Sequence, residues 1–587
     1  MRTLVFSSMP AGAAPLTHIA AGPWCFSGRE ENFPGWDDPS QPDAFFPLPL
    51  DPYPDGGSIM DAARAANGAA LKLLPLLASS TGLQNREDFP SPEFLQTSFG
   101  PFALLACHVL AERQQRVLDL VRIHTSTALK VPLLPSDLPF SFSDSVDFMV
   151  RGVQDMMFNH YAYSRIIESV APPSWQLEYL PPVNLPVAAP LLRKTPLSIL
   201  RSLLRNLPFP KLKGFSLFQS LLFSMAVLSN KREKGDQSID FSAYCGTPME
   251  WLFPAEELIL KCIPVSLTRA LACARSKRQT PRLQKEKRGP LRVISPSFSQ
   301  DDAYRARLAL LRNKGYRLTS VQHGANYGNL ESVGGIVLEY SQHAFISWGW
   351  TRHDKFSVNA ISLPHPLLHN LAGKHRETAA RLILVGMEMS TFSYRLKSRP
   401  QAGSLPAYRA SKVRFLEIME KYLALDQGGE AGAELSYRPY FKVAGGLDDA
   451  DYIQRRLPGI SLCTGDLTSQ MLACRLLVLD HYGTTLHMAL AADVPCLAFW
   501  HAEDWSMEAG SLKAFDLLRG AGILHETAEE AAAKAMEIWM KPELWWKSKA
   551  VRDARQQWLK HYADINGNTA LATAKLNSRW WKALRSL

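Results

Sequence analysis

The chain has 587 residues, more than one hydrophobic core usually organises, so two or three domains are expected. Hydrophobic residues make up 46% and charged residues 20%, which is typical of a globular protein and excludes a disordered one. The net charge of +10 suits anionic partners such as nucleotide donors, acidic glycans or lipid head groups. Nucleic acid is not predicted as a partner, because the sequence has no zinc-finger spacing, RNA-binding aromatic motif or basic heptad helix.

The cysteines and the N-terminal residues indicate the cellular compartment of the protein. None of the eight cysteines forms a C-x-x-C pair, and Cys474 and Cys496 sit in apolar runs, so buried thiols in a reducing cytoplasm are expected. The opening Met1–Phe6 predicts a strand rather than a signal peptide. No apolar run reaches the roughly 18 to 20 residues that span a bilayer. We therefore expect a cytoplasmic protein and keep open a peripheral position on the inner membrane.

The first 290 residues are the hardest to interpret. A short strand and a loop rich in Pro, Gly and Asp precede a mostly helical part over 58–130, and prolines punctuate 131–215. The apolar run Phe215–Leu228 has basic ends, and it predicts either a buried or amphipathic helix or an interfacial membrane contact. A second basic stretch, Arg275–Arg288, is either a solvated loop or a contact with a membrane surface or polyanion.

From Arg292 onward the chain alternates between strands and helices. Near-continuous apolar strands that alternate with helices predict parallel sheets covered on both faces. Strands are expected at 292–295, 316–322, 344–348, 381–386, 437–443, 460–463, 474–480 and 494–500, and helices at 302–314, 409–424, 484–492, 511–520, 527–540 and 544–562.

The predicted fold class is α/β, with two Rossmann-like domains that face a cleft and a helical N-terminal elaboration. The break at Leu363–Pro366 marks the connection between the domains. We predict an acceptor-side domain over 1–370, with helical insertions at about 58–275, and a nucleotide-donor-binding domain over 371–587 with C-terminal helices. In such folds the carboxyl ends of the strands from both domains line the cleft.

One wall of the predicted cleft is the loop that starts at Gln322-His323-Gly324. Its small residues let the backbone approach a phosphate or a sugar. His323 is either a structural histidine at a strand end or a group that donates to phosphate or takes part in acid–base chemistry. Glu331 and Glu339 are candidates for base or nucleophile, although a surface carboxylate is the commoner interpretation of each residue alone.

The other wall is the turn Asp480–Gly483 with the helix that opens at Thr484 and Thr485. Free N–H groups and the helix dipole make such a turn an anion site, and the two hydroxyls add donors. Plain N-capping is the alternative interpretation.

Two further residues are weaker candidates for donor binding. His365, next to a proline at the domain junction, could reach a nucleotide phosphate, and Arg438 could pair with a phosphate or carboxylate. No metal site is predicted: Asp449-Ala450-Asp451 has a suitable spacing but is expected to lie in a loop after Gly445-Gly446.

The chain resembles a family of transferases from bacterial O-antigen and other surface-carbohydrate clusters. It is more distantly similar to capsule-polysaccharide glycosyltransferases of GT-B architecture and to teichoic-acid glycerophosphotransferases. The resemblance covers nearly the whole chain and rests on four blocks: Gly22–Cys25; Phe99–Phe102; Gln322–Gly324 with Tyr327-Gly328 and Trp348–Trp350; and Val494–Trp500 with Phe515–Leu518 and Ala521–Ile523.

The resemblance implies a GT-B fold and transfer of a sugar or sugar-like group from a nucleotide-activated donor, without a separate cofactor. The chain departs from the family pattern at three positions. Ala325 stands where a glycine is expected, His343 where an acidic residue is expected, and Met488, beside His487, where a glutamate near the ribose is expected. Methionine does not accept a hydrogen bond from a ribose hydroxyl as a carboxylate does, so altered donor choice or loss of activity are both open.

We therefore predict a metal-independent glycosyltransferase that acts on a surface polysaccharide or a lipid-linked or other glycoconjugate acceptor. Two alternatives remain: a phosphotransferase that moves a polyol phosphate, and a non-catalytic component of polysaccharide assembly.

Overall fold

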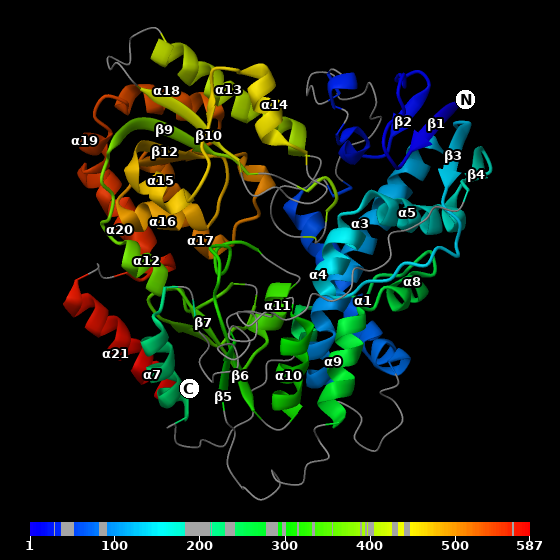
Figure 1. Ribbon diagram of the computed structural model, residues 1–587, viewed down its shortest axis with the longest axis horizontal. Helices are drawn as coiled ribbons and strands as arrows, with labels where there is room; N and C mark the ends of the chain where they lie inside the picture. The colour runs from blue at the N-terminus through cyan, green and yellow to red at the C-terminus, as the bar shows by residue number, and fades with distance from the viewer. Residues whose placement is uncertain are drawn as a thin grey trace, which may run out of the picture.

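The computed structural model consists of three parallel β-sheets with helices packed around and between them (Figure 1). The predicted α/β class with parallel sheets is thereby confirmed. The structure describes residues 1–28, 30–33, 35–36, 52–53, 55–81, 91–181, 212, 214–228, 241–276, 292–295, 301–313, 316–331, 335–354, 356–387, 390–393, 396, 404–424, 433–439, 447–565 and 569–586. Most of the second basic stretch (277–288), the lysines and arginine around 211–234 and residues 440–446 lie outside these ranges.

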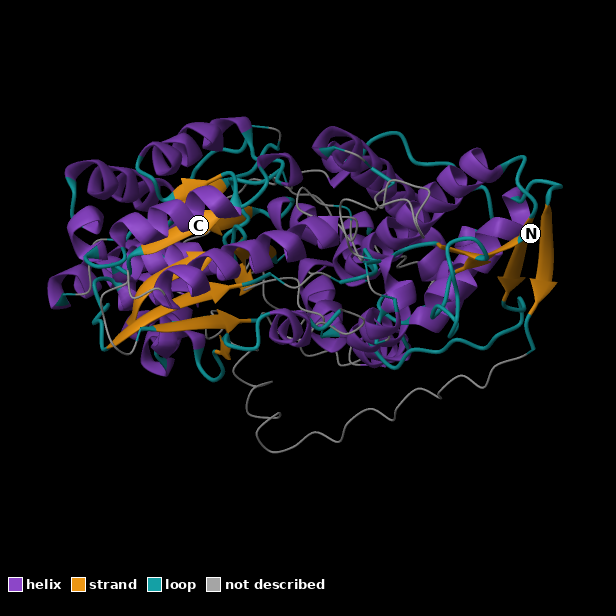
Figure 2. Cartoon of the chain, turned by 90° about the horizontal axis from the view of Figure 1, so that it is seen from above, coloured by secondary structure: helices purple, strands orange, loops and turns teal. Residues whose placement is uncertain are grey.

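The first sheet was only partly predicted from the sequence. Its strand order is β2-β1-β3-β4, with bounds Arg2–Val5 (β1), His18–Ala20 (β2), Leu129–Leu133 (β3) and Trp175–Tyr179 (β4). The long helices α1 (Gly56–Ser80) and α3 (Gly100–His124) pack on each other, and α5 (Met156–Val170) packs on α3. Figure 2 shows this sheet at one end of the molecule, with helices between it and the other strands.

The second sheet carries the first predicted wall of the site. Its order is β5-β6-β7-β8, from Arg292–Ser295 (β5), Arg317–Val321 (β6), Ala344–Ser347 (β7) and Ala360–Ser362 (β8). The helices α9 (Val265–Ser276) and α10 (Asp302–Asn313) pack together beside it. Helix α7 (Leu217–Leu228) and the C-terminal helix α21 (Ala570–Ser586), which the sequence analysis did not predict, share a buried cluster with β5, β6 and β7.

The third sheet carries the second wall. Its six strands have the order β11-β10-β9-β12-β13-β14, all parallel, with β9 (Ala379–Val385) and β12 (Cys474–Leu479) at the centre. The other strands are Glu434–Arg438 (β10), Ser461–Leu462 (β11), Cys496–Phe499 (β13) and Leu524–His525 (β14). Its helices include α12 (Pro366–Leu371), α13 (Leu405–Ala424), α14 (Asp449–Arg456), α15 (Leu467–Ala473), α16 (Thr484–Ala492), α17 (Ala509–Gly520), α18 (Ala528–Ile538), α19 (Pro542–Trp546) and α20 (Lys549–Tyr562).

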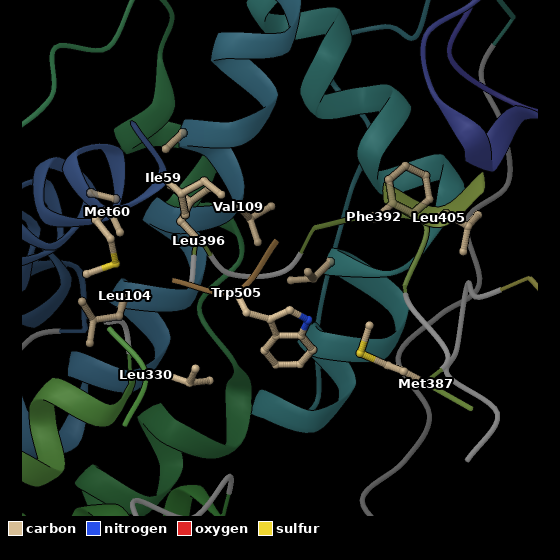
Figure 3. Packing of buried hydrophobic residues seen from close by; sticks show 14 of the residues in the cluster. Ile59, Met60, Leu104, Val109, Leu330, Met387, Phe392, Leu396, Leu405 and Trp505 are labelled. Carbon is tan, nitrogen blue, oxygen red and sulfur yellow. The ribbon is translucent and has the colours of Figure 1, made fainter. Parts of the chain in front are cut away.

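One continuous buried cluster joins the parts of the molecule. Figure 3 shows Leu104 and Val109 of α3 near Leu330, from the loop after β6, and Trp505 and Met387, from loops of the third sheet. Continuous burial across these parts fixes their relative positions, because packed cores do not deform gradually. Seven described cysteines are free, and six of them are buried.

Two findings concern the expectations about membranes and metals. Among the described residues, no single helix has the length and apolarity needed to cross a membrane, although the bent pair Pro92–Ser98 and Gly100–His124 passes that test by length and composition. The Asp449-Ala450-Asp451 segment begins helix α14 and is not a loop, which corrects the prediction. Asp449 is 1% exposed and accepts hydrogen bonds from Arg409 and Lys412.

Candidate functional site

The loop after β6 is held in place by Gln322. This side chain is buried, and its Oε1 accepts hydrogen bonds from the backbone N–H of Trp348 and from Nε1 of Trp350, both at 2.9 Å. Its Nε2 donates to the carbonyl of Gly324 at 2.8 Å. Gln322 thus links the strand end to the Trp348–Trp350 turn and fixes the residues that follow it. All of these hydrogen bonds are to other residues of the chain, and the contact of Gln322 with a nucleotide-activated donor stays a prediction.

His323 is the first exposed side chain after the strand. Its side chain is 52% exposed, whereas the carboxylate of Glu339, on the short helix α11 (Gly335–Tyr340), is buried. The hydroxyl of Tyr327 lies between them: it donates to Glu339 Oε2 and lies 2.9 Å from His323 Nδ1. His323 Nδ1 is 3.8 Å from Glu339 Oε2. The structure therefore brings two of the predicted catalytic residues together through a third that was not predicted.

The Tyr327 hydroxyl lies closer to one imidazole nitrogen of His323 than to the other, 2.9 Å from Nδ1 and 3.3 Å from Nε2, which favours one tautomer of the ring. A tyrosine hydroxyl has one proton, and here that proton goes to the carboxylate, so the phenolic oxygen accepts from His323 Nδ1–H. Nε2 then carries the lone pair. A buried carboxylate that acts through this hydrogen-bond chain favours the tautomer with the proton on Nδ1.

The turn after β12 presents a helix N-terminus. Gly483 is the N-cap residue of α16 in an extended conformation, and Thr484 and Thr485 form the first turn of that nine-residue helix. Gly483, Thr484 and Thr485 are all partly exposed. Among the described residues, no hydrogen-bond partner of the Thr485 hydroxyl is found, so this hydroxyl and the first N–H groups of α16 can serve a ligand.

The two turns are in direct contact. The backbone N–H of Ala325 donates to Thr484 Oγ1 at 3.3 Å, and a Cβ at Gly324 would lie 4.0 Å from the same oxygen. The hydroxyl of Tyr482 donates to the Ala325 carbonyl at 3.0 Å and accepts from Asn329 Nδ2. His323 and the N-terminus of α16 therefore lie at one junction between the second and third sheets.

A buried ion-pair network supports the second turn. The Asp480 side chain, 1% exposed, accepts from the backbone N–H of Met387 at 2.7 Å and lies 2.8 Å from His481 Nδ1. Lys412 Nζ donates to Asp449 and lies 3.5 Å from Asp480 Oδ2. Burial acts to lower the pKa of Lys412, but the two carboxylates outweigh it and raise that pKa. The predicted phosphate contact of Asp480 stays a prediction; the contacts seen hold the turn.

Three other predicted residues lie away from His323 or are engaged elsewhere. The backbone N–H of Glu331 donates to the Ser506 carbonyl at 2.9 Å, so this residue belongs to the contact with the third sheet's loops. His365 caps α12, and its ring lies 4.0 Å from that of Trp348. Arg438 donates to the carbonyls of Cys463 and Gly465.

The departures from the family pattern are also placed. Met488 is 8% exposed, so its thioether presents little surface to a ligand at this site. His487 beside it is fully buried, and burial lowers its pKa to about 4. His343 lies 3.3 Å from Nη1 of Arg317, at the start of β6 and away from the strand end that carries His323.

Four residues of the junction were not predicted as site residues: Tyr327, Asn329, His481 and Tyr482. Tyr327 and Tyr482 stand in the same sequence segments as predicted residues, and position next to a strand end is the signal that could have found them. Their partners, Glu339 on α11 and Ala325 in the opposite turn, are set by tertiary structure.

A family model described as LIC12162 family transferase matches residues 2–576. The chain belongs to the LIC12162 family of transferases. The predicted relation to transferases is confirmed at this level. No curated protein sequence matches the chain.

Among solved structures, the chain is similar to TarM, with 13% identity, a TM-score of 0.31, and coverage of 54% of this chain and 58% of TarM. It spans less than two thirds of the length of that protein. It is also similar to a Thermobaculum terrenum O-GlcNAc transferase mutant (11% identity, TM-score 0.29, 92% and 86% coverage) and to the glycosyltransferase SnogD from Streptomyces nogalater (13%, 0.29, 60% and 84%). These scores are low, so the function is inferred from this chain's own residues.

Proposed function

We propose that this LIC12162 family transferase is a glycosyltransferase that moves a sugar from a nucleotide-activated donor to a surface polysaccharide or other glycoconjugate. The observation that supports this most strongly is the junction itself. An exposed imidazole, linked to a buried carboxylate, lies beside a helix N-terminus with an available hydroxyl. Acid–base catalysis and stabilisation of a leaving phosphate are the two functions that sugar transfer from a nucleotide requires.

In the proposed reaction the acceptor hydroxyl attacks the anomeric carbon of the donor, and its proton passes to Nε2 of His323. The bond from the anomeric carbon to the phosphate oxygen breaks, and the nucleotide leaves with the electron pair. The first N–H groups of α16 and the hydroxyl of Thr485 stabilise the charge that develops on that phosphate. Tyr327 and Glu339 orient the imidazole and stabilise it when it is protonated.

Nucleotide binding is the first experiment. Thermal-shift measurements with uridine, cytidine, guanosine and thymidine diphosphates should show stabilisation by one base class, because a ligand that binds only the folded state raises its stability. The Thr485→Val variant should reduce the shift. Thr468→Val is the matched control, since Thr468 is also the second residue of a helix, α15. No shift with any of the four diphosphates would overturn the proposal.

Turnover is the second experiment. With the matching nucleotide sugars, the release of nucleotide should fall about 10²- to 10⁴-fold in His323→Ala, the usual effect of removing an acid–base group. His18→Ala, in β2 of the first sheet, should leave it unchanged. Mass spectrometry of the product distinguishes a transferred sugar from a transferred polyol phosphate. A polyol phosphate in the product, or equal rates in wild type and His323→Ala, would contradict the glycosyltransferase assignment.

A further inference from the structure

Helix α7 exposes large apolar side chains on its outer face, while its inner face buries both apolar residues, such as Phe223, and two serines. Leu217, Phe218, Leu221 and Met225 are 46%, 73%, 47% and 57% exposed. At 100° per residue they fall within one arc of about a quarter-turn. The buried face contains Ser220 and Ser224, each of which donates its hydroxyl to the backbone carbonyl of the residue four positions earlier. A surface helix of a globular protein normally carries charged and polar side chains on its outer face, so the exposed apolar residues of α7 are unusual.

The neighbouring helix α21 adds positive charge to the same surface. Lys575, Lys582 and Arg585 are exposed along one side of α21, and neither α7 nor α21 contains an acidic residue. The two helices lie side by side near the C-terminus (Figure 1), and Gln219 Nε2 donates to Asn577 Oδ1 at 2.8 Å. The four exposed apolar residues of α7 and the three exposed cations of α21 therefore lie on two adjacent helices, and we call these seven residues the α7–α21 face.

Both helices direct their inner sides to the second sheet. The rings of Phe215 and Trp580 lie 5.1 Å apart, and Phe223 and Trp580 belong to one buried cluster with Ile294 and Ile346 of the strands. Because the inner sides are shared, the exposed sides of α7 and α21 both point away from the sheet. Among the described residues, the exposed apolar stripe is therefore no part of the cluster that α7 and α21 form with the second sheet.

We propose that the α7–α21 face docks on a membrane surface that contains anionic lipids. Four large apolar side chains on adjacent turns can enter the boundary between head groups and acyl chains, while the lysines and the arginine bind the head-group phosphates. Helix α7 has 12 residues, too few to cross a bilayer, so it lies in the plane of the interface.

Charge distinguishes this partner from a second copy of the chain. In a two-fold symmetric pair the same patch lies on both subunits, so three cations would face three cations with no acid in either helix. On an anionic surface the same cations are attracted to the partner, so this repulsion does not arise. The excess of ten positive charges over the whole chain acts in the same direction.

Vesicle flotation with the full-length chain tests the proposal. The wild type should float with phosphatidylcholine vesicles that contain phosphatidylglycerol and much less with phosphatidylcholine alone. A triple variant, Phe218→Gln, Leu221→Gln and Met225→Gln, should lower the bound fraction by about tenfold or more, because apolar burial at the interface is lost. Replacing Lys575, Lys582 and Arg585 with Gln should remove the preference for the anionic lipid and its dependence on salt.

A matched control removes equal apolar exposure elsewhere. Leu512, Met540 and Leu544 are 46%, 49% and 63% exposed on the third-sheet side, and their Gln variants should bind vesicles like the wild type. Nucleotide thermal shifts should be the same in all variants, which shows that each is folded and separates this proposal from the proposed activity. The proposal would be overturned if the wild type did not bind anionic vesicles, or if the control variant lost as much vesicle binding as the α7 variant. It would also be overturned if the wild type were a dimer in solution that only the α7 substitutions dissociate.

Discussion

The two turns that meet at the junction are built in opposite ways. The turn after β6 exposes its ionisable group, His323, and buries the carboxylate that orients it. The turn after β12 buries its ionisable groups, Asp480 and His481, and offers backbone N–H groups and threonine hydroxyls to solvent. In the proposed reaction the first turn moves a proton, which needs an accessible imidazole, and the second holds an anion, which needs fixed N–H donors.

The largest expected effect comes from breaking the support of the second turn. Lys412→Met removes the ammonium group that lies between Asp480 and Asp449. Asp449 then keeps Arg409 as an ion-pair partner, and both carboxylates stay buried. Removing one partner of a buried ion pair typically costs ~3–5 kcal/mol, because the remaining charge stays desolvated. We expect a loss of that size in the free energy of unfolding, measured by urea denaturation.

The matched control for this prediction is Lys549→Met. Lys549 pairs with Asp553 at 2.8 Å, but its side chain is 84% exposed, so a change of no more than about 1 kcal/mol is expected. Equal losses in the two variants would mean that the network around Lys412 contributes no more than a surface pair.

The second prediction concerns the first turn. Tyr327→Phe keeps the ring but removes the hydroxyl between His323 and Glu339. Because Tyr327 positions the base and does not touch substrate in the proposed reaction, kcat should fall by about ten- to a hundredfold while KM stays within about twofold. Steady-state kinetics with the nucleotide sugar identified by binding measures both.

Glu339→Gln provides the companion measurement for the second prediction. It keeps a hydrogen-bond acceptor for Tyr327 but removes the negative charge, so a fall in kcat similar to that of Tyr327→Phe is expected. If both variants instead raise KM and leave kcat unchanged, the three residues shape substrate binding and the proposed proton path is wrong.

The junction shows what the sequence could and could not predict. His323 and the Thr484 turn were predicted because both follow apolar strands, and strand ends of parallel sheets gather at one edge. The two turns are in contact in the structure, and the predicted roles of their residues stay predictions. The network around Lys412 could not be predicted, since a lysine inside a helix gives no sign that its partners lie 37 and 68 residues further on. In the folded chain, Lys412 on α13 reaches the Met387 carbonyl after β9 and Asp480 after β12, a meeting that depends on tertiary structure.

The same reasoning explains the first sheet and the last helix. Strands β12 and β13 of the third sheet are mostly apolar and are buried at every position, which is a strong local signal. In contrast, β2 has three residues, β3 contains Pro132, and β4 alternates polar and apolar residues with exposed positions, so their pairing depends on distant neighbours. Helix α21 buries Leu576, Trp580 and Leu584 against the second sheet, a partner that lies far back in the sequence.

A third prediction uses pH to probe the buried side of the second turn. His487 has a folded-state pKa of about 4 against 6.5 in the unfolded chain. Between these values the unfolded state binds the extra proton, so the free energy of unfolding decreases as pH falls and recovers above 6.5. Between pH 7 and pH 5, the titration of His487 alone should lower the free energy of unfolding by about 2 kcal/mol. Chemical denaturation at the two pH values measures it.

His487→Leu isolates the contribution of this ring from those of the other titrating groups. The variant should lose about 2 kcal/mol less than the wild type over the same pH interval, whatever its stability at pH 7. Parallel losses in the two proteins would show that burial of this residue of α16 does not hold its imidazole neutral.

The smallest expected effect tests whether the two turns need each other. The hydroxyl of Tyr482, on the second turn, donates to Ala325 and accepts from Asn329 in the first, and Tyr482 is 1% exposed. Tyr482→Phe should lower the free energy of unfolding by about 1 kcal/mol, and somewhat more if the amide of Asn329 is left without a replacement partner. Tyr179→Phe, at a 61% exposed site where the hydroxyl bonds Glu168, should change little.

A further readout of Tyr482→Phe separates stability from alignment. The hydrogen bonds of Tyr482 fix the backbone of residues 325–329, which follows His323 directly, so a shift of this segment changes the distance from the base to the anion site. Loss of alignment by even a fraction of an ångström lowers rates more than it lowers stability. A kcat for Tyr482→Phe that falls by about tenfold at nearly unchanged nucleotide affinity would therefore support two turns that act as one site, whereas an unchanged kcat would mean that each turn keeps its geometry without the other.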